Sequence, residues 1–213
     1  MTYAQIAALA SIARERGISI ASHDDDSAEK LAFMDGLKAS ISEFPISLDV
    51  AREARARGLH TVAGAPNVML GHSHSGNLSA REAVEAGAID VLCSDYYPAA
   101  LLDAVFTLRD ECGLDIARAF ALVSVNPAKA AGIADEVGSL AVGKRADVLL
   151  VREIACGEAG TRTMPVVTRA FVGGRSVFRS HYPDQPLGYA RDLGERIDAA
   201  RADAARALFP EAV

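Results

Sequence analysis

The sequence predicts an α/β fold in which parallel strands alternate with helices. Four glycines each lie between an amphipathic stretch and an apolar, strand-like run. These pairs are Gly17 with 18–21, Gly36 with 41–46, Gly58 with 59–65 and Gly87 with 88–93. Glycine commonly ends a helix because it adopts a positive φ without steric cost. Because parallel neighbours need a helix-length connection, the repeat predicts parallel strands joined by right-handed crossovers.

Capping boxes mark two of the helix starts. Asp26 precedes Glu29 by three residues, and Ser79 precedes Glu82 by three residues. In such a box each side chain satisfies a free backbone N–H of the first turn. Further helical periodicity covers residues 98–111 and 116–123, followed by a short capped turn. We therefore expect the α/β domain to span residues 1–134.

The pattern changes after this domain. Residues 138–151 are typical of a turn and a strand, and residues 166–178 alternate around Gly173 and Gly174 as a β-hairpin does. Apolar residues at helical spacing between 187 and 208 predict a terminal helix that packs on a core. We expect a small β module at residues 135–182 and a helical tail at 183–213.

The composition excludes several classes of function. The 213 residues are 50% apolar and carry a net charge of −6, with no basic run. Nucleic acid and anionic membrane are therefore poor partners. No apolar stretch approaches the roughly 20 residues that span a bilayer, and no export signal is visible. Three cysteines without a close pair fit reduced thiols, so we expect a soluble cytoplasmic protein.

Polar residues gather where the predicted strands end. Ligands of parallel α/β sheets bind at the carboxyl ends of the strands, so these residues are the first candidates for function. His23 could ligate a divalent metal, and Asp95 could ligate the same metal or accept a proton from its water. The structural alternatives are that His23 hydrogen-bonds within a helix cap and that Asp95 caps the helix beginning near Pro98. Position alone leaves both alternatives open.

The densest polar cluster is the loop at residues 72–77, whose sequence is HSHSGN. His72 and His74 are two residues apart, so they point in opposite directions if the loop is extended. The loop suits a phosphate ligand, with a plain surface loop as the alternative. His60 and His181 are expected to be structural. The chain has no GxGxxG fingerprint, P-loop or GxSxG elbow, so those chemistries lack their signatures.

Six segments, taken in order, resemble the second half of a protein of the amidohydrolase superfamily. They are ASHDD, EFP, GAPNVMLGHSHSGN, SDYYPAALL, NPAKAAG and GSLAVGKRADVLLV. The last is shared by many amidohydrolases, whereas GAPN with SHSGN and the SDY segment are narrower to a family of diphosphatases of phosphonate catabolism. The resemblance implies a metal-dependent (β/α)8 barrel of the TIM type with a small β-sandwich. This chain would supply a partial barrel, with the strands corresponding to 5–8.

The resemblance also implies an activity and a site. The family is a hydrolase that releases pyrophosphate from a ribose 5-triphosphate, using a divalent metal ion that we expect to be zinc, with manganese or iron as alternatives. By similarity, the metal ligands are His23, Asp95 and His74, and Asp95 handles the proton of the attacking water. Asn67, His74, Ser75 and Asn77 are expected to bind the phosphorylated sugar. His72 departs from the glycine expected at its position.

Half of the expected metal site is absent from this sequence. The superfamily's HxH pair and its bridging lysine or glutamate would lie upstream of Met1. Eight strands with eight helices need about 250 residues, so we expect a homodimer or a missing N-terminal half, and little activity from the chain alone. Two other functions stay open: hydrolysis of a C–N bond in a cyclic amide or aminopurine, and a truncated, non-catalytic binding partner.

Overall fold

The computed structural model describes residues 2–71, 78–156 and 162–182. The chain divides into two compact units, Met1–Lys144 and Arg145–Val213. The sequence placed this boundary earlier, after Ala134. The expected terminal helix at 187–208 lies outside the described residues.

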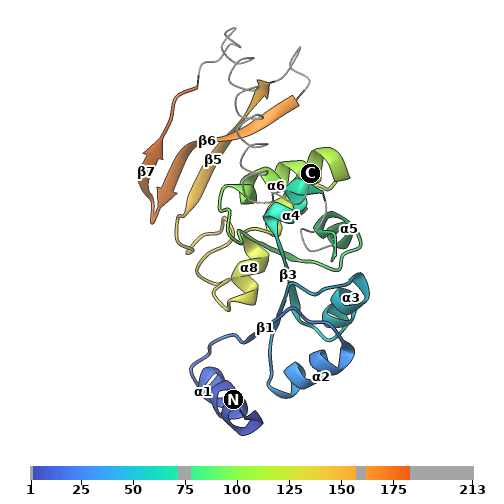
Figure 1. The fold of residues 1–213 in the computed structure, drawn as a ribbon. Helices are drawn as coiled ribbons and strands as arrows, with labels where there is room; N and C mark the ends of the chain where they lie inside the picture. Colours follow the sequence, from blue (N-terminus) through green and yellow to red (C-terminus); the bar gives the residue numbers. More distant parts are fainter. Residues whose placement is uncertain (1, 72–77, 157–161, 183–213) are drawn as a thin grey trace. The chain divides into compact units, whose positions relative to one another are not determined.

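The first unit is a parallel α/β structure, as predicted (Figure 1). Its sheet has the order β1-β2-β3-β4, and each strand pairs in parallel with the next. The strands are β1 (Ala21–His23), β2 (Ile41–Glu43), β3 (His60–Gly64) and β4 (Val91–Cys93). The helices are α1 (Tyr3–Glu15), α2 (Ala28–Gly36), α3 (Leu48–Ala56), α4 (Ala65–Leu70), α5 (Ala80–Glu85), α6 (Ala100–Cys112), α7 (Ile116–Ala121) and α8 (Val125–Ala130).

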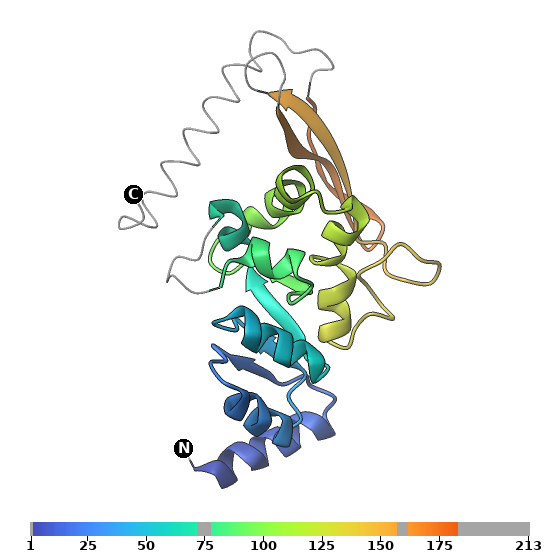
Figure 2. The same ribbon diagram turned by 90° about the vertical axis from the view of Figure 1, so that its right-hand side faces the viewer.

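Two small apolar clusters pack against this sheet, one on each face. Leu31 of α2 and Ala54 of α3 pack with Leu59, and both views show α2 and α3 side by side (Figures 1 and 2). Val62 and Val91 pack with Ala130 of α8 and are joined there by Ile41 and Cys93. Alternate residues of a strand point to opposite faces. Glu43, two residues after Ile41, therefore shares a face with this second cluster.

The residues that cap the helices agree with the predictions at one helix and differ at two others. Ser79 caps α5 by accepting a hydrogen bond from Glu82 N, as expected. Asp26 does not cap α2, because Ser27 accepts from Lys30 N instead. Likewise Asp95 caps no helix: α6 begins at Ala100 without a side-chain cap. The structural alternative for Asp95 is therefore wrong.

Three of the four glycines that were predicted to end helices do so. Gly17, Gly58 and Gly87 have φ of 67°, 85° and 69°, the left-handed conformation that ends a helix. Gly36 lies within α2, and the left-handed residue after that helix is Lys38, at φ 60°. The expected role of Gly36 as a cap is thus wrong by two residues.

The second unit contains a three-stranded antiparallel sheet in the order β5-β6-β7. Its strands are β5 (Val148–Cys156), β6 (Arg162–Val172) and β7 (Arg175–Arg179). Gly173 and Gly174, both at positive φ, form the turn between β6 and β7, so the predicted hairpin is confirmed. Among the described residues, no helix is both long and apolar enough to cross a membrane.

Candidate active site

The carboxyl ends of three strands carry residues with unusual backbone conformations. Asp24 follows β1, Phe44 follows β2 and Asp95 lies two residues after β4; their φ angles are 54°, 55° and 50°. Residues other than glycine rarely adopt such angles, and they concentrate at functional sites when the surrounding structure holds them there. Sharp turns of this kind redirect the chain at the edge of the sheet where ligands of α/β proteins bind.

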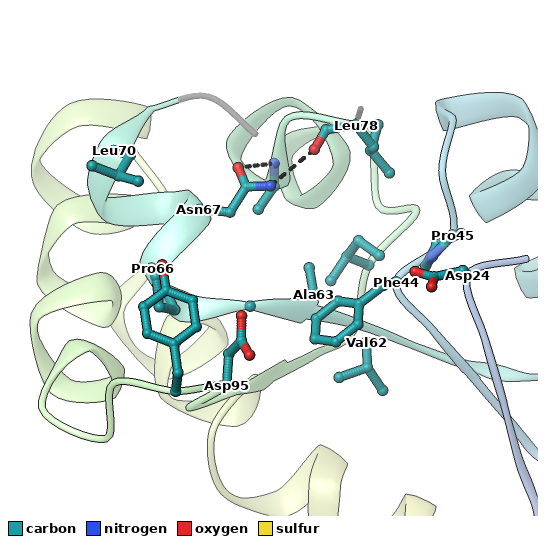
Figure 3. A pocket seen from close by; sticks show the side chains of 14 residues that line it. Asp24, Phe44, Pro45, Val62, Ala63, Pro66, Asn67, Leu70, Leu78 and Asp95 are labelled. Carbon is teal, nitrogen blue, oxygen red and sulfur yellow. Dashed lines mark hydrogen bonds between the residues drawn. The ribbon is translucent and has the colours of Figure 1, made fainter. Parts of the chain in front are cut away.

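A cavity of about 250 Å³ opens at this edge (Figure 3). Its wall includes Asp24, Phe44, Asn67 and Asp95, and Figure 3 shows the Asp95 carboxylate between Pro66 and Phe44. Apolar side chains supply most of the remaining wall. A mainly apolar pocket with a few polar groups is typical of a small-molecule site.

The Asp95 carboxylate lies close to Gly64 and Tyr96 at the edge of the cavity. Its Oδ2 lies 3.4 Å from the point that a Cβ on Gly64 would occupy, so glycine at that position gives the carboxylate room. Burial and then the charge of Asp95 raise the pKa of Tyr96, whose ring also lines the cavity. The carboxylate is exposed to solvent and can therefore reach a ligand.

His23 ends β1, but its neighbour Asp24 is the residue that lines the cavity. Its Nδ1 lies 2.9 Å from Asp24 Oδ2, and its ring meets the ring of Phe44 edge to face at 5.1 Å. A carboxylate on Nδ1 fixes the ring orientation and leaves Nε2 as the nitrogen that could bind a ligand. His23 thus has a side-chain partner outside the helix cap, which Ser27 forms, and its Nε2 stays available for the predicted metal-ligand role.

A buried network supports the end of β1. Asp25 is fully buried and accepts hydrogen bonds from Ser22 Oγ at 2.6 Å and from Ser42 Oγ at 2.5 Å. Lys30 Nζ lies 3.8 Å from Asp25 Oδ1 and donates to the carbonyls of His23 and Asp24. These contacts connect β1, β2 and α2, so they fix the backbone that presents His23.

Asn67 bridges the two sides of the 72–77 loop. Its Nδ2 donates to Leu78 O at 3.0 Å, and its Oδ1 accepts from Ala80 N at 3.0 Å, as the dashed lines of Figure 3 show. The predicted contacts of His74, Ser75 and Asn77 lie outside the described residues. Substrate binding by Asn67 stays a prediction, and the structure adds a bridging role.

Glu43 is a candidate that the sequence reasoning missed. Its register partner across β1 and β2 is His23. Burial is the main cause that raises the pKa of the Cys93 thiol to about 11, and the charges of Glu43 and Asp95 add to it. Glu43 therefore lies close enough to Cys93 for its charge to act on the thiol. The predicted run covered residues 41–46 and so placed Glu43 inside a strand, whereas β2 ends at Glu43 in the structure.

Of the two histidines that were expected to be structural, His60 lies at the opposite end of this sheet, and His181 belongs to the second unit. His60 begins β3, and its Nδ1 is 2.9 Å from Asp90 Oδ2, which also accepts from Arg55 at 2.7 Å. His181 follows β7 in the second unit. Contacts at the amino-terminal ends of parallel strands, such as those of His60, typically stabilise the fold and do not bind ligands.

The described residues do not complete a metal site. No group of three or more His, Cys, Asp or Glu side chains in ranges 2–71, 78–156 and 162–182 comes together in a way that could hold an ion. Catalytic zinc sites normally use three protein ligands. His23 and Asp95 are therefore not sufficient for such a site among these residues.

The fold and these strand-end residues agree with a comparison against known protein families. The amidohydrolase family matches residues 1–177. The chain belongs to the amidohydrolase family. The resemblance predicted from its motifs is thereby confirmed.

A curated relative narrows the comparison. The chain is 42% identical over 144 residues to the alpha-D-ribose 1-methylphosphonate 5-triphosphate diphosphatase of Escherichia coli strain K12. The match covers 67% of this amidohydrolase chain and 38% of the E. coli protein. The chain therefore spans well under two thirds of that relative's length.

Solved structures show the same fold at low sequence identity. An amidohydrolase from Thermotoga maritima MSB8 superposes with a TM-score of 0.56 at 18% identity, covering 77% of this chain and 44% of that one. An adenosine deaminase from Xanthomonas campestris, solved with bound zinc, gives a TM-score of 0.59 at 15% identity, covering 95% of this chain and 55% of that one. These similarities support the amidohydrolase fold alone.

Proposed function

We propose that this chain is part of a hydrolase that releases pyrophosphate from alpha-D-ribose 1-methylphosphonate 5-triphosphate in phosphonate catabolism. The observation that carries the proposal is the 42% identity over 144 residues to the E. coli diphosphatase. The strand-end carboxylate Asp95 supports it, because that residue lines a mainly apolar cavity with a few polar groups, the lining typical of a small-molecule site.

The proposed chemistry of this chain centres on Asp95. Its carboxylate accepts the proton of the water that attacks the phosphoryl group, and pyrophosphate leaves. A positioned general base of this kind typically accelerates a reaction by about 10²–10⁴-fold. Asn67, His74, Ser75 and Asn77 are the proposed contacts to the phosphate oxygens.

A divalent metal ion is part of the proposal, with zinc first and manganese or iron as alternatives. His23, Asp95 and His74 are its proposed ligands, and a bound divalent ion would stabilise negative charge on the phosphoryl oxygens. The described residues alone do not form the site. The remaining ligands would come from the other strands of a (β/α)8 barrel, in which the strands of this chain correspond to 5–8.

A chimera tests the proposal. In it, this chain replaces the matching part of the E. coli diphosphatase, and pyrophosphate release from a ribosyl triphosphate is measured with zinc, manganese or iron(II). We expect the chimera to release pyrophosphate, and Asp95→Asn to lower the rate at least about 100-fold. Asp49→Asn is the matched control, because its side chain is 96% exposed on α3.

The other outcomes separate the rival functions. Ammonia or a ring-opened product from a cyclic amide or aminopurine, without pyrophosphate, would replace the proposal with C–N hydrolysis. A folded chimera without any turnover would favour a non-catalytic binding partner. The isolated chain is expected to show little or no turnover, and a robust rate abolished by Asp95→Asn would contradict that expectation.

A further inference from the structure

The second unit carries a concave, positively charged surface on its three-stranded sheet. A cavity of about 310 Å³ is lined by Arg152, Arg169, Arg179 and His181, together with apolar and hydroxyl groups. None of its described lining residues is acidic. We call the surface formed by these four residues the basic groove.

Two of these arginines are direct neighbours across the sheet. Arg169 of β6 and Arg179 of β7 are register partners, and both side chains are exposed. Directly opposite residues of antiparallel strands have Cβ atoms about 4.5–5.5 Å apart, and like charges at such positions destabilise the sheet. Among the described residues, no acidic side chain forms an ion pair with either one. The positive charges are thus adjacent and uncompensated there.

The third arginine is held beside them. Arg152 of β5 donates from Nη1 to Tyr182 O at 3.3 Å, and both residues line the groove. Leu150, two residues earlier in β5, is the register partner of Arg169. Three strands therefore contribute one arginine each to a single concave surface.

We propose that the basic groove binds a multiply charged oxyanion of the phosphate or diphosphate class, carried by a small molecule. Guanidinium groups form paired, charge-assisted hydrogen bonds with phosphate oxygens, and such bonds are stronger than neutral ones. An anion between Arg169 and Arg179 would turn a repulsive pair into two attractive contacts. The volume lies at the lower end of the range for small-molecule sites, which favours a compact anion over a protein segment.

Calorimetric titration of the full chain with inorganic pyrophosphate, in the presence of EDTA, tests the proposal. We expect one binding site with a Kd of about 0.1–1 mM, as two or three charge-assisted contacts would give. Arg169→Gln should weaken binding at least about tenfold. Arg175→Gln is the matched control: it removes the same charge from exposed β7 outside the groove, and should change the Kd less than about twofold.

Thermal unfolding supplies an independent measurement. Pyrophosphate should raise the unfolding midpoint of the chain and of Arg175→Gln, but not that of Arg169→Gln, because ligand binding stabilises only a folded state that binds it. Without ligand, Arg169→Gln should be at least as stable as the parent, since it relieves the repulsion.

Two results would overturn the proposal: no heat of binding at millimolar pyrophosphate, or equal weakening by Arg169→Gln and Arg175→Gln. Tighter, groove-dependent binding of a polyglutamate peptide than of pyrophosphate would overturn it in favour of an acidic protein partner. Because these readouts involve no turnover, they are independent of the proposed diphosphatase activity.

Discussion

At the scale of single residues, the site combines groups that the sequence revealed with groups that only the fold assembles. His23 and Asp95 could be selected because each follows an apolar run that was predicted to be a strand. Glu43 lies inside the run predicted at 41–46, so the sequence did not place it at a strand end. The contact between His23 Nδ1 and the Asp24 carboxylate involves a residue with a left-handed φ, which a sequence pattern does not reveal.

The pKa of the Cys93 thiol depends on its burial and on the carboxylates around it. Burial, with the carboxylates of Glu43 and Asp95, raises the pKa of its thiol from 9.0 to about 11. At pH 8 the reactive thiolate is therefore about 100-fold scarcer than in the unfolded chain. We expect iodoacetamide labelling of Cys93, followed by peptide mass spectrometry, to be slower in the native protein by about that factor.

Removing a neighbouring negative charge should have the opposite effect. Glu43→Gln is expected to lower the pKa of Cys93 and to speed its labelling, because the thiolate then has one carboxylate fewer beside it. Glu29→Gln, at an exposed position of α2, is the control and should leave the rate unchanged. An unchanged rate in Glu43→Gln would place Glu43 away from Cys93.

Asp25 is expected to contribute strongly to stability. Asp25→Ala leaves the hydroxyls of Ser22 and Ser42 without their buried acceptor, so it should lower the free energy of unfolding by about 3 kcal/mol. Urea unfolding measures this change. Asp26→Ala, at the exposed next residue, should change it by less than about 0.5 kcal/mol. Equal losses in both variants would contradict the role of the buried network.

Gly138 tests close packing against backbone conformation. A Cβ at this residue would lie 2.6 Å from Ala128 Cβ and 3.0 Å from Ser124 O, and its φ is +87°. We expect Gly138→Ala to lower the free energy of unfolding by about 2–3 kcal/mol. Gly143, at φ +92° with open space around it, isolates the backbone effect, so Gly143→Ala should cost about 1 kcal/mol. Similar values for the two variants would exclude a steric contribution.

At the scale of elements, the repeated helix–glycine–strand units made the four parallel strands predictable. Their boundaries were less predictable: the first strand was expected at 18–21, whereas β1 covers Ala21–His23. Backbone pairing with β2 decides where a short edge strand begins, and that contact is not local in sequence. Helix α4 was missed because its first residue, Ala65, was assigned to the strand predicted at 59–65, and no loop separates β3 from α4.

Asn67 should control the order of the chain around the 72–77 loop. Asn67→Ala removes the acceptor of Ala80 N, so hydrogen exchange of that amide should accelerate, and the free energy of unfolding should fall by about 2 kcal/mol. The amide of Ala83, which donates to Ser79 O within the same helical segment, is the internal control. Equal acceleration at both amides would indicate unfolding of α5 instead of loss of the bridge.

At the scale of the whole molecule, the parallel sheet of the first unit has four strands with β1 and β4 at its edges. Exposed strand edges promote association unless something covers them. Near the β1 side of the chain, Leu9 and Ile12 of α1 are 57% and 44% exposed. Their spacing of three places them on one face of the helix. This apolar face is consistent with the proposed homodimer or complementary half.

Light scattering checks this proposal. We expect the parent chain to associate as its concentration rises, and Leu9→Glu or Ile12→Glu to shift the mass toward that of the monomer. Leu140→Glu introduces the same charge at an 84% exposed position away from α1, and should leave the mass unchanged. A parent chain that stays monomeric at all concentrations would rule out self-association through this face.

The left-handed turns at Asp24, Phe44 and Asp95 also limit how the family member can diverge. Side chains branched at Cβ strongly disfavour this backbone conformation, whereas asparagine, aspartate and glycine tolerate it. After random mutagenesis of these three codons, few of the folded variants should therefore carry valine, isoleucine or threonine there. The backbone conformation at this edge of the sheet thus restricts which amino acids the three positions can accept.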